Sequence, residues 1–243
     1  MNRRRGAATL VAALVAALVG IALSLGTTKT VAQQPIQRVE AGSARAALAN
    51  LQVKGRAPKT GYDRALFGPS WADVDRNGCD TRNDVLRRDL TSYVLRTGTH
   101  GCLVRSGTLR DPYTGTTVSF VRGPSTSEAV QIDHVVALSD AWQKGAQQLP
   151  PDSRRALAND SLNLLAVDGP TNQRKSDGDA ATWLPPNRPY RCPFVARQIA
   201  VKAKYRLWVT RAERDTFRQI LATCPSQPLP MAAPFVLGGG VDG

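Results

Sequence analysis

An imidazole, a carboxylate and two carboxamides occur in three short segments of the sequence. Asp133 and His134 are adjacent, Asn163 follows in a second segment, and Asn172 opens a third. An imidazole with an ordinary pKa of about 6.5 can accept a proton from water at neutral pH. One carboxylate and one amide oxygen, completed by waters and phosphate oxygens, suit Mg²⁺ better than zinc. Together these residue types could support metal-dependent hydrolysis of a phosphodiester bond.

Basic residues beside this set could hold the substrate. Arg174 and Lys175 follow Asn172 on the same predicted helical turn, where they are candidates for contacts with flanking phosphates. As an alternative, both could be solvated helix charges. An isolated Asp-His pair is more often a structural pair than a catalytic one, so the interpretation depends on the combination of segments. His100, the other histidine, lies in a Thr-Gly-Thr-His-Gly turn and is interpreted as structural.

Two strands and a helix must position these residues. The apolar run 128–138 begins as a strand that contains the Asp-His pair, and the run 162–167 forms a second strand. A Gly-Pro pair ends the second strand, and Thr171 can cap a helix whose first turn carries Asn172. The predicted order is therefore strand, insertion, strand, helix.

The rest of the chain predicts further helices and strands. A helix is predicted over 81–95, because apolar residues recur there mostly three to five positions apart. Residues 102–123 alternate apolar and polar residues between turns, which is typical of short antiparallel strands. The remaining predicted helices lie at 43–53, around 152–159 and within 194–223. These patterns predict an α+β fold with a small antiparallel sheet and flanking helices.

The charge of the chain favours a polyanionic partner. Its 243 residues include 32 Lys and Arg against 19 Asp and Glu, which gives a net charge of +13. Nucleic acid is the first candidate for such a partner, followed by an anionic membrane or cell-wall polymers. The hydrophobic content of 42% is close to the globular average, so most of the chain is expected to fold.

The N-terminus has the pattern of an export signal. Three arginines at 3–5 precede an uncharged apolar stretch at 6–26, and small residues follow near Ala32. Cleavage after Ala32 is favoured over retention as a membrane anchor, because Ala and Gly make the run only moderately hydrophobic. The predicted divisions are a signal peptide or N-terminal membrane anchor at 1–32, a linker and short helix at 33–55, one folded domain at 56–224 and a disordered tail at 225–243.

Four cysteines follow the leader, and none forms a Cys-x-x-Cys pair. This spacing argues against a structural zinc site. In an exported protein, an even number of separated cysteines indicates two disulfides. Chain order favours Cys79–Cys102 and Cys192–Cys224 among the three possible pairings.

The segments D-H-V-V-A-L from Asp133, N-L-L-A-V from Asn163 and N-x-x-K-S-D from Asn172 resemble the core of the HNH, or ββα-metal, endonuclease family. The upstream segments G-C-D-T-R-N-D-V-L-R-R-D-L and D-P-Y-T-G, and the downstream basic helix, are similar to a group of exported HNH proteins of actinobacterial type. The resemblance covers about residues 56–224. The family often has His at the position of Asn172, and Asn is a variant that favours Mg²⁺ or Mn²⁺.

The resemblance implies a role for each residue of the core. His134 would be the general base, Asp133 and Asn172 would bind Mg²⁺ or Mn²⁺, and Asn163 would position the base. The implied protein is a secreted endonuclease, or one held at the outer face of the membrane if the leader is retained. It would cut nucleic acid, foremost DNA, with little sequence preference, and no protein partner is implied. The alternative is a non-catalytic basic module that binds extracellular DNA or anionic cell-wall polymer.

Overall fold

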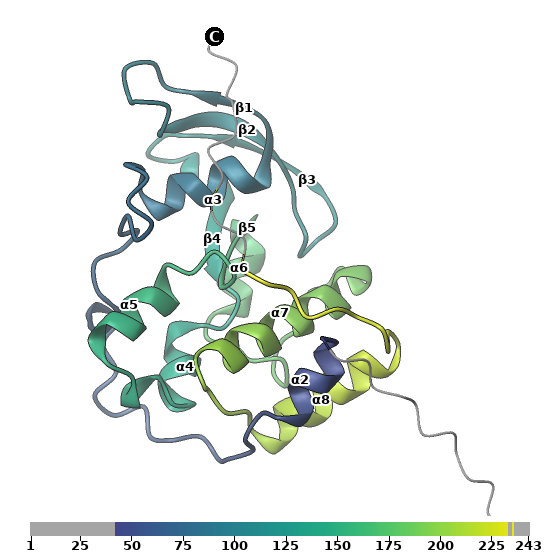
Figure 1. The fold of residues 1–243 in the computed structure, drawn as a ribbon. Helices are drawn as coiled ribbons and strands as arrows, with labels where there is room; N and C mark the ends of the chain where they lie inside the picture. The colour runs from purple at the N-terminus through teal and green to yellow at the C-terminus, as the bar shows by residue number, and fades with distance from the viewer. Residues whose placement is uncertain (1–41, 233–234, 236–243) are drawn as a thin grey trace, which may run out of the picture. The chain divides into compact units, whose positions relative to one another are not determined.

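The computed structural model describes residues 42–232 and residue 235. The predicted leader at 1–32 and the end of the predicted tail lie outside the described residues. The described part contains two antiparallel sheets and several helices, which confirms the predicted α+β class (Figure 1). None of the described helices is long and apolar enough to cross a membrane.

The described elements follow the chain in a mixed order. The α-helices are α2 (Ala44–Ala49), α3 (Thr81–Asp89), α4 (Leu138–Gln143), α5 (Pro151–Ala158), α6 (Gly169–Lys175), α7 (Arg191–Lys204) and α8 (Arg211–Ala222). The strands are β1 (Leu90–Leu95), β2 (Val104–Arg110), β3 (Thr117–Val121), β4 (Val130–His134) and β5 (Leu164–Asp168). The short 3-10 helices are η1 (Arg64–Phe67), η2 (Ser127–Ala129), η3 (Ala146–Gln148) and η4 (Arg188–Tyr190).

Strands β1, β2 and β3 form an antiparallel meander beside α3 (Figure 1). Leu90 lies opposite Leu109, and Leu109 lies opposite Val118. The helix predicted over 81–95 is wrong in its second half, because α3 ends at Asp89 and β1 follows at once. The hydrogen-bond partner of β1 is β2, a later segment of the sequence. Local apolar spacing therefore could not reveal this strand.

Strands β4 and β5 form the second sheet, and α6 follows β5 directly. Asp133 lies opposite Leu165, and His134 lies opposite Leu164. This antiparallel pair followed by a helix confirms the predicted order of strand, insertion, strand and helix. The helix begins earlier than predicted, because the carboxylate of Asp168 caps it by accepting a hydrogen bond from the backbone N–H of Thr171 at 2.8 Å.

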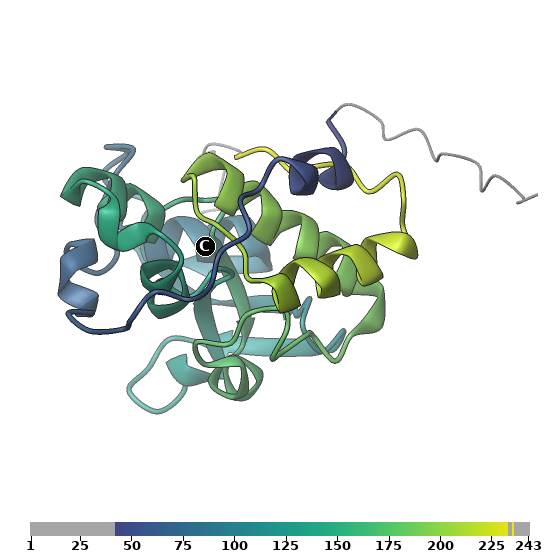
Figure 2. The same cartoon turned by 90° about the horizontal axis from the view of Figure 1, so that it is seen from below.

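Helices α2, α7 and α8 pack together beside the second sheet (Figure 2). Leu165 and Val167 of β5 share one buried apolar cluster with Leu48, Phe194 and Phe217 from the three helices. Because apolar burial is worth roughly 1.5–3 kcal/mol for each large side chain, this cluster is a main contributor to the stability of the second sheet. The short helix predicted at 43–53 is therefore packed into the core.

The two ends of the described chain run beside each other. The backbone N–H of Ala44 donates to the carbonyl of Gln227 at 2.9 Å, and that of Leu229 donates to Gly42 at 3.0 Å. Parts of the predicted linker and tail thus pair with one another through backbone hydrogen bonds.

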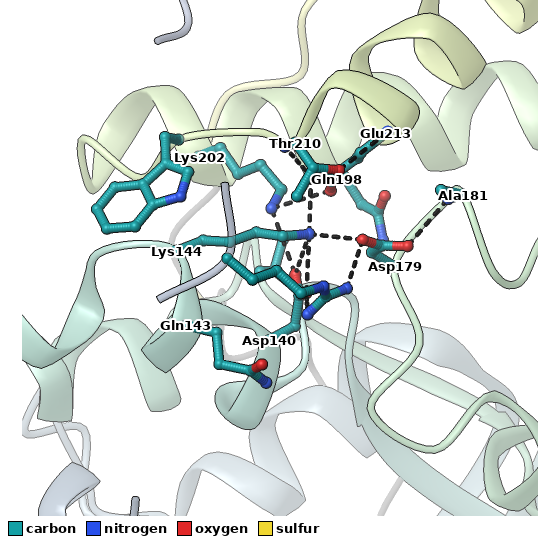
Figure 3. A network of polar contacts seen from close by, with 12 residues as sticks. Asp140, Gln143, Lys144, Asp179, Ala181, Gln198, Lys202, Thr210 and Glu213 are labelled. Atoms are coloured by element: carbon teal, nitrogen blue, oxygen red, sulfur yellow. Dashed lines mark hydrogen bonds and ion pairs between the residues drawn. The ribbon is translucent and has the colours of Figure 1, made fainter. Parts of the chain in front are cut away.

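A buried ion network links helices that are separate in the sequence (Figure 3). The ammonium of Lys144 lies 2.8 Å from Asp140, 2.7 Å from Asp179 and 2.7 Å from Glu213. Lys202 adds contacts to Glu213 at 3.0 Å and to Asp140 at 3.4 Å. Arg56 contacts Asp140 and Asp179, so three cations meet three carboxylates. The network joins α4, α7 and α8 to the segment after α6.

Two disulfides confirm the pairing favoured by chain order. Cys79 is bonded to Cys102, and Cys192 is bonded to Cys224. The second bond joins the start of α7 to the residues just after α8, across 32 positions of sequence. Closing a loop of this length reduces the conformational entropy of the unfolded chain.

Loss of the second disulfide is expected to destabilise the fold without unfolding it. We expect the Cys192→Ser, Cys224→Ser double variant to lose about 2–4 kcal/mol of unfolding free energy in urea denaturation. The matched control is the wild-type chain, which should contain no thiol that reacts after denaturation without reductant. A reactive thiol in that control would contradict the pairing.

Candidate active site

One cleft of about 420 Å³ receives three of the side chains singled out in the sequence. Asp133 and His134 reach it from the end of β4, and Asn172 reaches it from α6. The antiparallel pairing of β4 with β5 brings the start of α6 beside the strand that carries the Asp-His pair. The same cleft is lined by Arg64, Ser139 and Asp177.

The carboxylate of Asp133 is buried and held on both oxygens. Its Oδ1 accepts a hydrogen bond from Lys175 Nζ at 2.9 Å, and its Oδ2 accepts one from the hydroxyl of Tyr113. Burial raises the pKa of the Asp133 carboxyl, although the neighbouring ammonium of Lys175 opposes this shift. These two contacts fix the orientation of the carboxylate at the floor of the cleft.

Lys175 was predicted to contact a substrate phosphate, which requires an accessible ammonium group. The structure instead buries this ammonium group next to Asp133. The Lys175 side chain is fully buried, and Nζ donates to Asp133 Oδ1 and to the backbone carbonyl of His134, both at 2.9 Å. A phosphate contact would require Nζ to leave a buried carboxylate, which is costly. The observed contacts instead make Lys175 a positioning residue for Asp133 and His134.

The His134 ring is fixed from two sides. Its Nε2 lies 2.8 Å from the carbonyl oxygen of Ala158, and Trp71 stacks on it with ring centroids 6.3 Å apart and planes 13° apart. A carbonyl only accepts hydrogen bonds, so Nε2 must carry the proton and Nδ1 is left as the basic nitrogen of the neutral ring. Burial lowers the pKa of His134 to about 3, with Arg64 and Lys175 adding to the effect.

This environment predicts an unusual titration for His134. In the metal-free chain, the ring resonances of His134 are expected to stay unchanged between about pH 5 and 8, because burial disfavours the imidazolium. Two-dimensional NMR of the imidazole groups measures this, with the exposed ring of His100 as the internal reference signal. A midpoint near 6.5 for His134 would show that the ring is solvated and that the Ala158 contact does not fix it.

Asn163 holds the backbone after His134 and the end of α5. It is fully buried, and its Oδ1 accepts a hydrogen bond from the backbone N–H of Val136 at 2.9 Å. Its Nδ2 donates to the carbonyls of Val136 and Leu157 at 3.3 and 3.2 Å. Val136 lies two residues after His134, and Leu157 directly precedes Ala158, whose carbonyl contacts the ring. Asn163 therefore acts through the backbone and does not touch the imidazole.

Asn172 lines the cleft, and Arg174 lies two residues further along α6. Asn172 Nδ2 donates to Gln131 Oε1 at 2.9 Å, so its Oδ1 is oriented by the same contact. Within residues 42–232, this Oδ1 has no hydrogen-bond partner. Arg174 is exposed and donates to the hydroxyl of Thr171 at 2.7 Å. An exposed guanidinium of this kind can reach a phosphate.

Three residues of the site were missed in the sequence. Tyr113 belongs to the D-P-Y-T-G segment, for which the sequence predicted no role in the site, and its ring is fully buried with its hydroxyl donating to Asp133. Trp71 and Arg64 come from the turn-rich segment before α3. The guanidinium of Arg64 has no hydrogen bond or ion pair in the described part of the chain, and it lines the cleft. Only long-range packing brings these three residues to the Asp133–His134 pair.

Two oxygen donors of the cleft fit a hard divalent cation. Asp133 offers a carboxylate whose oxygens each have one hydrogen bond and a further lone pair, and Asn172 offers the unpaired Oδ1. Such a set needs water and phosphate oxygens to complete an octahedron, as Mg²⁺ usually does. Within residues 42–232, no group of three or more Asp, Glu, His or Cys side chains is arranged to hold a metal ion.

Comparison with known proteins identifies the family. Residues 80–220, which include both sheets and most of the residues that line the cleft, match the family described as GmrSD restriction endonucleases, C-terminal domain. The chain belongs to this family. A protein of Arthroderma benhamiae named "Uncharacterized secreted protein" is 37% identical over 186 residues, which cover 76% of this chain and 86% of that protein. No solved structure matches the chain. This member of the GmrSD C-terminal domain family thus has a nuclease-related domain.

Proposed function

We propose that this chain is an exported, HNH-type endonuclease that hydrolyses nucleic acid with the help of Mg²⁺ or Mn²⁺. The observation that carries the proposal is the presence of Asp133, His134 and Asn172 around one cleft. Membership of a family of restriction endonuclease domains supports it. The two disulfides, the leader pattern and the secreted relative support export.

In this proposal His134 is the general base. The hydrogen bond from Nε2 to Ala158 leaves Nδ1 to accept the proton of the attacking water. Asp133 and Asn172 would hold the cation, which neutralises charge that develops on the phosphate and the leaving oxygen. Lys175 and Tyr113 orient the Asp133 carboxylate, and Asn163 keeps the segment after His134 in place.

The substrate is bound through its phosphates. Arg64 is an exposed residue that lines the cleft, Arg174 is an exposed residue of the same helix as Asn172, and the net charge of +13 attracts a polyanion from a distance. Contacts of this kind do not distinguish bases, so cleavage is expected to have little sequence preference. Activity is expected to fall steeply as salt concentration rises, because binding releases counterions from the nucleic acid. DNA is the favoured substrate.

A plasmid assay tests the proposal. The purified full chain, with both disulfides intact, is incubated with supercoiled DNA in Mg²⁺, in Mn²⁺ and in EDTA, with a matched RNA substrate in parallel. Nicking that requires the divalent ion supports the endonuclease. Salt-sensitive binding of DNA or anionic cell-wall polymer without cleavage under any metal would overturn it in favour of the basic binding module.

A further inference from the structure

We propose that a second cavity beside His134 binds a nucleobase of the strand whose phosphate lies in the cleft, an inference that rests on the nuclease function proposed above. The cavity has a volume of about 330 Å³, which is in the usual range of ligand pockets. It is lined by residues from the segment 64–71, by His134 and by the end of α5. Phe67, Pro69 and Ala158 make its walls mostly apolar.

The cavity and the cleft share part of their walls. Arg64, His134 and Leu138 line both of them, whereas Asp133 and Asn172 line the cleft. A phosphate held at the proposed cation ligands is covalently joined to a nucleoside on each side. One base of the substrate therefore lies close to the point where the two hollows meet, and the cavity is placed to receive it.

Trp71 offers this base a flat aromatic surface. The residue is half-buried and lines the cavity, and its indole ring lies nearly parallel to the His134 imidazole, with planes 13° apart. A base that stacks on the indole would extend this existing stack, and every base has a π-face that can do so. An aromatic surface between apolar walls suits a base better than a sugar or a phosphate.

The backbone holds Trp71 in a conformation that a bulky residue rarely adopts. Its φ of +59° lies in the left-handed region, which costs free energy for a residue other than glycine. Its carbonyl accepts a hydrogen bond from the backbone N–H of Thr81 at 3.3 Å, and its ring packs against the apolar cluster that includes Leu86 and Phe120. Because such conformations are concentrated at functional sites, this one supports a role for the ring beyond packing.

Asn159 leaves a buried hydrogen-bond acceptor at the wall of the cavity. The residue is only 2% exposed, and its Nδ2 donates to the carbonyl of Arg155 at 2.9 Å, so its Oδ1 is the remaining acceptor. Among residues 42–232, no group donates a hydrogen bond to this Oδ1. Buried polar groups are normally paired, and each of the nucleobases carries an N–H group that can supply the bond.

Arg64 supplies the charge that must accompany the base. The residue is exposed, and it lines both the cleft and the cavity. A guanidinium in this position can contact the phosphodiester that joins the base in the cavity to the phosphate in the cleft. The cavity thus combines an aromatic surface, a hydrogen-bond acceptor and a cation, which are the groups that bind a nucleotide.

The cavity favours a single-stranded or locally unpaired substrate. A base in a duplex is paired at one edge and stacked on both faces, so it must leave the double helix before it can enter. A base of a single strand does not require this step. Since stacking and an N–H contact are open to all bases, occupancy of the cavity agrees with cleavage of little sequence preference.

Binding of short DNA to the full chain in EDTA tests the cavity without cleavage. Fluorescence anisotropy measures the dissociation constants for a single strand, for its duplex and for a strand of abasic deoxyribose phosphates. The wild type is expected to bind the single strand most tightly. Trp71→Ala should weaken this binding by about 5–150-fold, the usual contribution of one stacked base, and should leave binding of the abasic strand unchanged. Trp71→Phe keeps an aromatic ring and should recover most of the affinity.

The matched control is Tyr93→Ala, which removes a half-buried aromatic residue of β1 that lines neither the cavity nor the cleft. This variant should keep the wild-type affinity for all three ligands. Equal wild-type affinity for the single strand and the abasic strand would overturn the base-binding role of the cavity. Equal losses in Trp71→Ala and Tyr93→Ala, or a wild type that binds neither strand, would also overturn it.

Photo-crosslinking provides a second measurement that needs no variant. A single strand that contains bromodeoxyuridine is irradiated with the wild-type chain in EDTA, and peptide mapping locates the attached base. Attachment at Trp71 is expected, and attachment only outside the segment 64–71 would contradict the proposed position of the base. Neither experiment measures cleavage. A chain that fails to cut DNA can still prefer bases, and a chain that cuts can fail to distinguish the abasic strand, so the two proposals can fail separately.

Discussion

The His134→Ala variant is expected to lose metal-dependent cleavage by about 10²–10⁴-fold in kcat/KM, the usual contribution of a general base. The effect follows from the position of the ring, which lines the same cleft as Asp133 and Asn172 and whose Nε2 is fixed by Ala158. Initial rates of plasmid nicking under saturating Mg²⁺ measure it. Added imidazole should restore part of the rate, because the ring borders a second cavity of about 330 Å³ that a free imidazole can enter.

Two controls separate loss of the base from loss of the fold. His100→Ala removes the exposed histidine and should cleave at the wild-type rate. The thermal denaturation curve of His134→Ala should show a single cooperative transition, because the variant leaves the buried contacts of Asn163 and Lys175 in place. A folded His134→Ala protein that nicks plasmid within a few-fold of the wild type would disprove the assignment of the base.

The local patterns of the sequence were sufficient for the second sheet. The apolar runs around Asp133 and Asn163 are bounded by turn residues, so each strand can be read from its own residues. The helix with Asn172 follows a Gly-Pro pair, a common helix start. Because these three elements adjoin in the order predicted, the convergence of the three side chains could be expected before the structure was known.

The contacts that orient the site could not be predicted in this way. Lys175 has the sequence context of a solvated helix charge, yet the packing of α6 against β4 buries it on Asp133. Tyr113 lies in a turn, and Trp71 lies in a segment without apolar periodicity. Their partners are 20 or more positions away, and only tertiary packing selects them. Helix α4, in a stretch that was interpreted as a polar insertion, was missed for the same reason.

The ion network beside the site also could not be predicted from local sequence patterns. Asp140 belongs to α4, which starts four residues after His134, Lys144 directly follows that helix, and Asp179 lies four residues after Lys175. The network therefore connects both segments that leave the cleft to helices α7 and α8. A charged residue in the sequence predicts exposure. The full burial of Lys144 depends on three carboxylates that come from three parts of the chain.

Replacement of Lys144 by Met is expected to cost about 3–5 kcal/mol of unfolding free energy, the usual penalty for removing one partner of a buried ion pair. Lys144 is 0% exposed, and its loss leaves Asp140, Asp179 and Glu213 with only Lys202 and Arg56 for compensation. Met retains much of the apolar volume of Lys. The loss of unfolding free energy therefore measures the removal of the charge and not the creation of a large cavity. Urea denaturation followed by far-ultraviolet circular dichroism measures it.

Lys59→Met is the matched control for this prediction. Lys59 also pairs with an aspartate, Asp177, but at 3.2 Å between side chains that are 55% and 51% exposed. Solvent and salt screen such a pair, so its loss should cost about 1 kcal/mol or less. The difference between the two variants isolates the effect of burial. Equal stability losses would mean that the network around Lys144 is hydrated in solution, and that apolar packing alone holds the cleft segments against α7 and α8.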